Sequence, residues 1–196
     1  MGPIEYLWLI LAMFFAFVGV IRGFLKELGV TIVLVATLFA LDRLIPLIEQ
    51  FIRDGKLQFL GLKAIAPNQF EVSTNLLLMI VFQLILLAAV FVAYQGETLA
   101  FEGSGPKGFL GVMLGLMIGM ANGYLVTGTL WWLLNHYRYP VSPAIVDPTK
   151  MTELARSIIN NGLLPLDLLG GGTTSVDSFG LLSVILVILI ILKVVR

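Results

Sequence analysis

The strongest constraint on this chain is a series of long apolar blocks with almost no charge inside them. These blocks occupy residues 6–21, 28–41, 75–94, 108–134 and 179–192 of the 196-residue sequence. Hydrophobic residues make up 59% of the chain and charged residues 12%, against about 25% charged in a typical soluble domain. Because about 20 apolar residues in a helix cross a bilayer, the sequence predicts an all-α integral membrane protein with a bundle of four to five transmembrane helices.

The second block is short by itself, and we expect its helix to continue beyond the last apolar residues. It would pass through Asp42, Arg43 and Pro46 towards residue 52 and emerge into the membrane interface. Residues 53–73 contain glycine and proline, and this composition favours a loop with one interfacial turn.

The chain divides into three parts by composition. Residues 1–137 are predicted to form a four-helix membrane domain, and residues 179–196 a C-terminal membrane helix. Residues 138–178 are rich in proline and glycine and are expected to face outward. In that segment Asp147 and Pro148 suit the cap and first position of a short amphipathic helix. Its apolar side would carry Met151, Leu154, Ile158 and Ile159.

Basic residues predict the orientation in the membrane. Arg22 and Lys26 follow the first block, and Lys193 and Arg196 follow the last. With five crossings these two ends share one side, which the positive-inside rule makes cytoplasmic. We therefore expect the N-terminus outside and the C-terminus in the cytoplasm. The connection before residue 108 is more acidic than basic and does not favour this orientation.

Aromatic residues gather at the end of the fourth block, as amphipathic rings do at headgroup depth. These aromatic residues are Trp131, Trp132, Tyr137 and Tyr139. We expect them to mark the membrane interface, together with the single histidine, His136.

The fourth block carries a ladder of glycines spaced four residues apart. Such a ladder lies on one helix face and lets a second helix approach closely. The spacing favours packing within the monomer over homodimerisation, and the ladder comprises Gly111, Gly115, Gly119 and Gly123. Asn122 beside it is expected to form a hydrogen bond across the same interface. Gly19 and Gly23 in the first helix share the spacing but are flanked by Phe15 and Glu27, so no second ladder is predicted.

Composition excludes several kinds of chemistry. The chain has no cysteine and one histidine, so thiolate and multi-histidine metal sites are ruled out. Its formal charge of zero gives no reason to expect a nucleic-acid partner. We find no catalytic motif and predict no cofactor. Asp42, Arg43 and Gln83 are the polar residues that could form a site inside the membrane.

Two segments resemble the CvpA family, the colicin V production proteins of bacterial inner membranes. Residues 19–27, Gly-Val-Ile-Arg-Gly-Phe-Leu-Lys-Glu, are similar to the Arg-Gly-Phe turn between that family's first two helices. Residues 107–111, Lys-Gly-Phe-Leu-Gly, followed by Gly115 and Gly119, are similar to its later glycine-spaced helix. The family usually has an acidic-basic pair where Lys107 and Gly108 stand here. The resemblance implies a cytoplasmic turn formed by Arg22, Gly23, Phe24, Lys26 and Glu27.

These observations favour a non-enzymatic scaffold or accessory protein of the bacterial inner membrane. The resemblance links such a protein to toxin export and envelope maintenance, and the partner would be another membrane protein or a second copy. A channel or transporter subunit is the alternative, and it would need a polar cavity around Asp42, Arg43, Gln83 or Asn122. A weaker alternative is a pigment- or quinone-associated subunit that uses His136 and the nearby tryptophans.

Overall fold

A computed structural model of the protein describes residues 4–66, 69–95, 101, 105–142, 148–170 and 180–195. Within them four helices are long and apolar enough to cross a membrane: α1 (Ile4–Arg22), α2 (Phe24–Arg53), α3 (Val72–Gln95) and α4 (Gly108–His136). The predicted all-α fold is confirmed, and each of the first four apolar blocks forms one helix.

The shorter elements lie around these four helices. Helices α5 (Glu153–Asn160), α6 (Pro165–Gly170) and α7 (Leu181–Val195) follow α4 in the chain. Two 3₁₀ turns, η1 (Gln58–Leu60) and η2 (Pro148–Lys150), and an antiparallel pair of strands, β1 (Ala64–Ala66) and β2 (Gln69–Phe70), complete the fold. The β hairpin and η1 replace the loop with one turn that we expected between the second and third helices.

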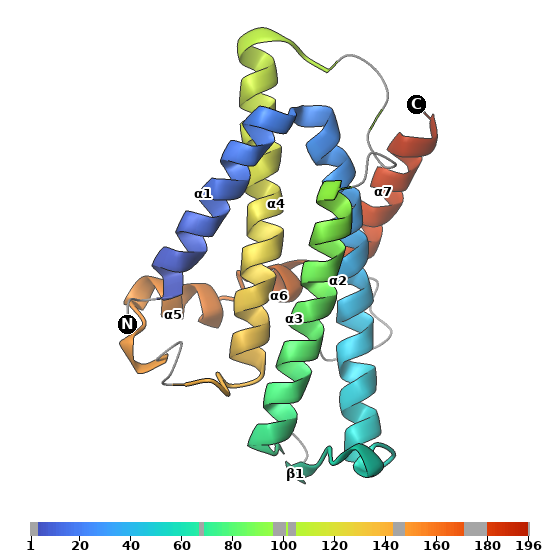
Figure 1. Ribbon diagram of the computed structural model, residues 1–196, viewed down its shortest axis with the longest axis vertical. Helices are drawn as coiled ribbons and strands as arrows, with labels where there is room; N and C mark the ends of the chain where they lie inside the picture. The colour runs from blue at the N-terminus through green and yellow to red at the C-terminus, as the bar shows by residue number, and fades with distance from the viewer. Residues whose placement is uncertain are drawn as a thin grey trace.

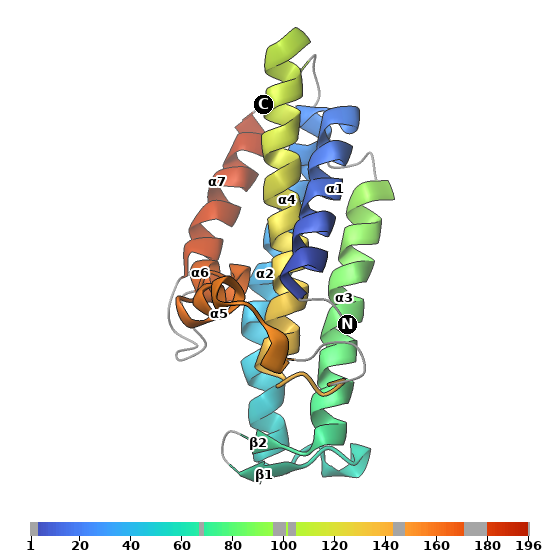
Figure 2. The same cartoon turned by 90° about the vertical axis from the view of Figure 1, so that its left-hand side faces the viewer.

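Helices α2 and α4 form the centre of the bundle (Figure 1). Helix α2 contacts α3, α4 and α7, while α1 packs along α4. The turned view in Figure 2 shows α5 and α6 lying across one side of the bundle, and the β hairpin closing the end where α2 stops and α3 starts. We call this the hairpin end, and the opposite end, where α1 turns into α2, the Gly23 end.

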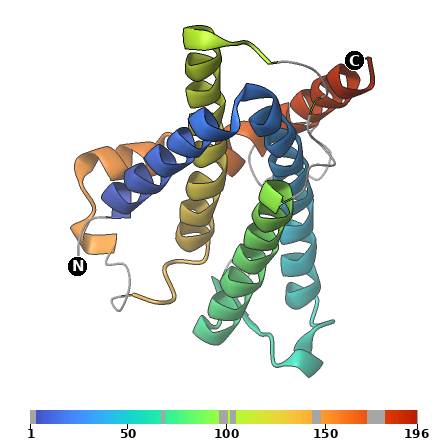
Figure 3. The same ribbon diagram turned by 45° about the horizontal axis from the view of Figure 1, so that its top comes forward.

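Helix α1 joins α2 through one residue, Gly23. Its φ of 85° lies in the left-handed region, which costs a glycine little because it has no Cβ. The bend is visible in the tilted view of Figure 3. Beyond it, α2 runs through Asp42, Arg43 and Pro46 to Arg53 without a break, as predicted. Its 30 residues span about 45 Å at 1.5 Å per residue, which exceeds the hydrocarbon core of a bilayer, about 30 Å.

Helix α7 is shorter than the other membrane helices. Its 15 residues span about 22 Å, so among the described residues α7 is shorter than the four helices that are long and apolar enough to cross a membrane. The end of α7 lies at the Gly23 end of the bundle, the same end as the turn between α1 and α2 (Figure 1). The basic residues that follow the first apolar block, Arg22 and Lys26, are therefore at the same end of the bundle as Lys193, which follows the last block.

Helix α5 begins later than we expected. Asp147 lies outside the described residues, Pro148 opens the separate turn η2, and the cap of α5 is Thr152, whose hydroxyl accepts a hydrogen bond from Ala155 N at 3.3 Å. Threonine followed by Glu153 in the first turn is a favourable helix start. The apolar side also differs, because Ala155 is fully buried whereas Leu154 is 67% exposed.

The aromatic residues at the end of α4 are inside the protein, so they do not contact headgroups as we expected. Trp131, Trp132, Tyr137 and Tyr139 are all buried. Trp131 Nε1 donates to Tyr139 Oη at 3.1 Å, and Trp132 Nε1 donates to Asp167 Oδ1 at 2.7 Å in α6. Buried indoles need acceptors, and here α6 and the turn after α4 supply them in place of headgroups.

The closest helix contact is the crossing of α1 and α4. A Cβ added at Gly115 would lie 2.6 Å from the Gly19 carbonyl oxygen, and one at Gly119 would lie 2.6 Å from that of Phe15. Gly123 meets Ala12 and Phe15 in the same way. Ladder glycines 115, 119 and 123 thus pack within the monomer, whereas Gly111 faces the carbonyl of Pro106 in the preceding connection. Gly19 also belongs to this interface, whereas Gly23 contacts nothing in it, so the first helix forms no second ladder.

We predict that Gly119→Ala destabilises the protein. Alanine is the better helix former by about 1 kcal/mol, but its methyl group would meet backbone atoms of α1 that have no room to move. We expect a net loss of roughly 1–3 kcal/mol, measured by denaturant unfolding in detergent. Met120→Ala is the matched control because Met120 is the next residue and is 54% exposed. Stability equal to or above wild type for Gly119→Ala would contradict the close crossing.

Candidate functional site

Two of the buried carboxylates lie at opposite ends of the bundle. At the Gly23 end the carboxylate of Glu27 is fully buried, and at the hairpin end Glu49 is 8% exposed. Carboxylates at such depth in a membrane helix need partners. Their partners come from different helices, so each glutamate organises one end of the bundle.

The Glu27 cluster consists of Arg22, Glu27, Thr31, Tyr94 and Asn122. Glu27 Oε2 accepts hydrogen bonds from Asn122 Nδ2 at 2.9 Å and from Tyr94 Oη at 3.0 Å. Arg22 Nη1 lies 3.6 Å from Glu27 Oε1 and its guanidinium stacks 4.6 Å from the centre of the Tyr94 ring. The cluster therefore joins all four long helices at one carboxylate.

Asn122 has no unused hydrogen-bonding group in this cluster. Its Nδ2 also donates to the Glu27 carbonyl at 3.1 Å, and its Oδ1 accepts from Thr31 Oγ1 at 2.8 Å. Asn122 thus forms a hydrogen bond between helices, but with α2 and not across the α1–α4 crossing of the glycine ladder, where we expected it. With the amide fully buried and both of its ends bonded, Asn122 fixes the position of α4 against α2.

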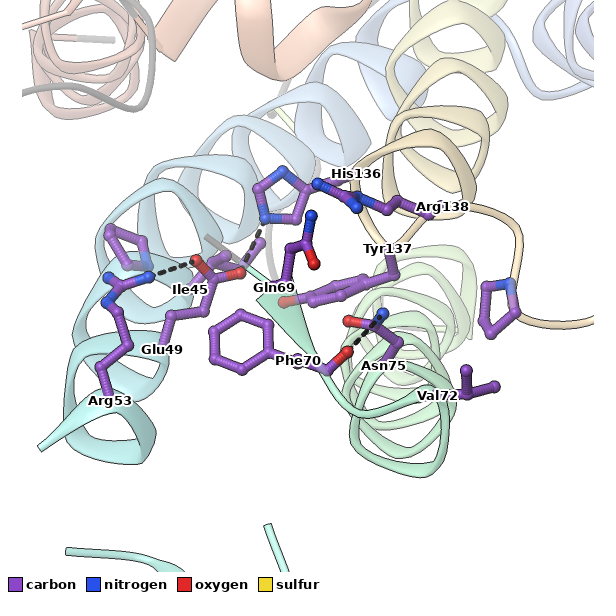
Figure 4. Close-up of a pocket in the computed structure, with 12 residues that line it drawn as sticks. Ile45, Glu49, Arg53, Gln69, Phe70, Val72, Asn75, His136, Tyr137 and Arg138 are labelled. Atoms are coloured by element: carbon purple, nitrogen blue, oxygen red, sulfur yellow. Dashed lines mark hydrogen bonds and ion pairs between the residues drawn. The ribbon is translucent and has the colours of Figure 1, made fainter. Parts of the chain in front are cut away.

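The Glu49 cavity lies at the hairpin end between α2, α3, α4 and β2. It encloses about 530 Å³ and is lined by both polar and apolar residues: Ile45, Pro46, Glu49, Arg53, Gln69, Phe70, Val72, Asn75, His136, Tyr137, Arg138 and Pro140. Figure 4 shows Glu49 and Arg53 on one wall, His136 and Arg138 on another, and Tyr137 extending between them.

Glu49 is the centre of the interactions on the cavity wall. Its Oε1 lies 2.7 Å from His136 Nε2, and its Oε2 lies 3.7 Å from Arg53 Nη1 (Figure 4). The His136 ring stacks on Trp132 with centroids 4.4 Å apart and meets Tyr137 edge-on at 4.9 Å. Because Nε2 of His136 is engaged with Glu49 and the ring is sandwiched between aromatic neighbours, the geometry does not favour this histidine as a pigment ligand.

The three residues of the predicted polar site do not line this cavity. Asp42 pairs with its neighbour Arg43 at 3.8 Å and packs against Gly170 at the end of α6. Gln83 is half-buried on α3. Among the described residues no group of three or more histidine, aspartate or glutamate side chains is placed to hold a metal ion.

Sequence reasoning missed the roles of Glu27 and Glu49. Glu27 was assigned only to a cytoplasmic turn with Arg22, Gly23, Phe24 and Lys26, but its side chain is buried in the bundle, whereas Lys26 is exposed. The signal available was its spacing of four from Thr31, which places both polar residues on one face of an otherwise apolar helix. For Glu49 and His136, 87 positions apart, no local pattern indicates the contact.

No protein-family model, curated protein or solved structure matches the chain.

We predict that Asn122→Ala destabilises the protein by about 2–3 kcal/mol, because it removes one of the two hydrogen-bond donors to the buried Glu27 carboxylate and leaves only Tyr94. Gln83→Ala, which removes a half-buried amide from α3, is the control and should cost less. The free energy of unfolding in detergent checks both.

A double-mutant cycle sharpens this test. Asn122 and Tyr94 donate to the same oxygen of Glu27, so Asn122→Ala and Tyr94→Phe are expected to be non-additive by about 0.5 kcal/mol or more. Strict additivity would show that the two donors do not share one carboxylate.

Proposed function

We propose that this chain is a non-enzymatic membrane scaffold or accessory protein, which acts by holding a rigid helical surface for a partner. The observation that carries the proposal is the separation of the two polar ends. Thr31 and Glu49 are 18 positions apart on α2, or about 27 Å. A transporter of one chain would need polar groups or water along that distance.

The inward face of α2 between the polar ends is filled by apolar side chains, whereas Asp42 on the same stretch packs against Gly170 of α6. This inward face is occupied by Leu34, Leu38, Leu41 and Ile45, none more than 1% exposed. Phe82 and Leu86 of α3 and Leu133 of α4 close the same layer and are fully buried. We call these seven residues the apolar layer. It supports a structural role for the buried carboxylates over a path for ions.

The buried polar residues on α4 close to this layer are also satisfied locally. Thr127 Oγ1 donates to the Gly123 carbonyl at 2.7 Å, and Thr129 Oγ1 donates to the Leu125 carbonyl at 2.6 Å. Hydroxyls bonded to their own helix do not offer a relay between helices. This arrangement favours the scaffold over a channel or transporter subunit.

The biological role in the proposal comes from the resemblance to the CvpA family. We propose that the protein works in the bacterial inner membrane and contributes to toxin export and envelope maintenance. The two resembling segments are in contact, since Gly19 of the first packs against Gly115 and Gly119 of the second. Because the two segments meet at the crossing of α1 and α4, we interpret them as two parts of one helix–helix interface.

The experiment that tests the proposal is purification of the tagged chain from its native membrane in mild detergent, followed by mass spectrometry. We expect another membrane protein at fixed stoichiometry. An unrelated multi-span protein with the same tag and abundance is the control, and a partner found with both would not count.

Liposomes provide the opposing test. We expect proteoliposomes of the full chain to pass ions and protons no faster than empty liposomes, because the apolar layer separates the polar ends. Solute flux well above that of empty liposomes, together with purification of the chain without a partner, would replace the scaffold with a transporter.

A further inference from the structure

Three large apolar side chains are exposed close together at the hairpin end. Phe59 is 80% exposed, Leu60 58% and Ile65 70%. Phe59 and Leu60 belong to η1 and Ile65 to β1, and we call the three residues the hairpin patch. Single exposed apolar side chains are ordinary on a protein surface, but a group of them with polar neighbours marks a surface that contacts a partner or a membrane.

The contacts of the hairpin with the bundle make the patch face outward. Leu62, in the middle of the segment, is buried. The backbone N–H of Lys63 donates to Thr74 Oγ1 at 3.1 Å, and the backbone N–H of Glu71 donates to the Lys63 carbonyl at 3.1 Å. Because these contacts tie the segment to the first turn of α3, the outward direction of the patch is part of the fold.

Helix α3 gives the depth of the hairpin in the membrane. Its first residue, Val72, and Val92 near its other end are both exposed, and every exposed side chain from Leu77 to Val92 is apolar. Val72 and Val92 are 20 positions apart, or about 30 Å, which is the thickness of the hydrocarbon core. The hairpin leads directly into α3 and closes that end of the bundle (Figure 2), so it lies where acyl chains give way to headgroups.

The surroundings of the patch also suit lipid. In the last turns of α2, Leu47 and Phe51 are exposed, so an apolar surface leads up to the hairpin from this side as well. Lys56 Nζ lies 4.9 Å from the centre of the Phe51 ring and pairs with Asp54 at 3.1 Å, while Lys63 is exposed. Apolar side chains beside lysines are typical of segments that lie in the membrane interface. Since Lys56 is already paired, apolar contact and not charge would drive the binding.

We propose that the segment formed by η1 and β1 is a membrane-binding element, which inserts Phe59, Leu60 and Ile65 among the acyl chains while Lys63 stays at headgroup depth. Its partner is the phospholipid of the bilayer that the four long helices cross. A patch in water would call for a protein partner, but the length of α3 places this one at the lipid boundary. The proposal rests on the membrane position of the helices and does not depend on the scaffold function.

The test uses single-cysteine variants of the full chain, which has no cysteine of its own. Phe59→Cys and Ile65→Cys replace exposed side chains and should fold, and Lys63→Cys is the matched control in the same hairpin. Each variant carries a bimane fluorophore and is placed in phosphatidylcholine nanodiscs, which are open to solvent on both faces. The fluorophore is quenched either by a nitroxide near the top of the lipid acyl chain or by iodide in the water.

We expect the lipid nitroxide to quench bimane at positions 59 and 65 more strongly than at position 63. Iodide should show the reverse order, with quenching at positions 59 and 65 roughly threefold weaker or less, because an anion does not enter the acyl region.

A charge placed in the patch tests whether its apolar side chains cause the insertion. In Ile65→Asp with bimane at position 59, quenching by the lipid nitroxide should fall roughly twofold or more, because aspartate is costly among acyl chains. Ile65→Leu in the same background is the control and should keep the quenching.

Equal quenching by iodide at positions 59, 63 and 65 would overturn the proposal, because the patch would then lie in water. Unchanged lipid quenching at position 59 in Ile65→Asp would also overturn it, since the apolar side chains would then not be what holds the hairpin in the membrane.

Discussion

The carboxylate of Glu27 is buried where four membrane helices meet, and the rest of the bundle depends on keeping it satisfied. An isolated carboxylate in a medium of low dielectric constant is very costly, whereas one with an arginine and two donors is tolerated. Arg22, Tyr94 and Asn122 supply these partners from α1, α3 and α4. Any arrangement that separates one of these helices from α2 removes a partner of the buried carboxylate, so the cluster favours one packing of the four.

The glycines and the carboxylate act at the same crossing. Lipid gives helices no hydrophobic reason to associate, so close van der Waals contact and hydrogen bonds have to hold them together. Gly115 and Gly119 allow α4 to approach α1, and Asn122, one turn further along α4, bonds to α2. One helix thus contributes both kinds of interaction, one on each side, and this explains the central position of α4.

Much of the fold could be predicted from the sequence because the membrane limits the choices. Long apolar blocks have to be helices, and α1 to α4 appear where these blocks lie. The continuation of α2 through Asp42, Arg43 and Pro46 was also predictable, because a helix that emerges into the membrane interface can carry charged residues there. The direction of Glu27 was not, since a glutamate after Arg22 and Lys26 fits an exposed turn equally well until the positions of Tyr94 and Asn122 are known.

The contacts at the hairpin end were even harder to predict from the sequence. The tryptophans of α4 match the pattern of a membrane interface, but α6 covers them and Asp167 accepts the hydrogen bond of Trp132. The Glu49 cavity draws its polar wall from α2, α3, β2 and the turn after α4. Contacts between residues so far apart in sequence depend on how the helices pack. The composition or periodicity of one segment does not predict them.

The most direct test of this account is the water accessibility of single cysteines along α2, because the chain has no cysteine of its own. Leu38→Cys lies in the apolar layer and Arg53→Cys at the hairpin end, and each would be exposed to a membrane-impermeant charged thiol reagent in proteoliposomes. The account predicts rapid labelling at position 53 and none at position 38. Labelling of both positions at similar rates would mean that water passes between the polar ends, which would contradict a dry core held together by the Glu27 cluster.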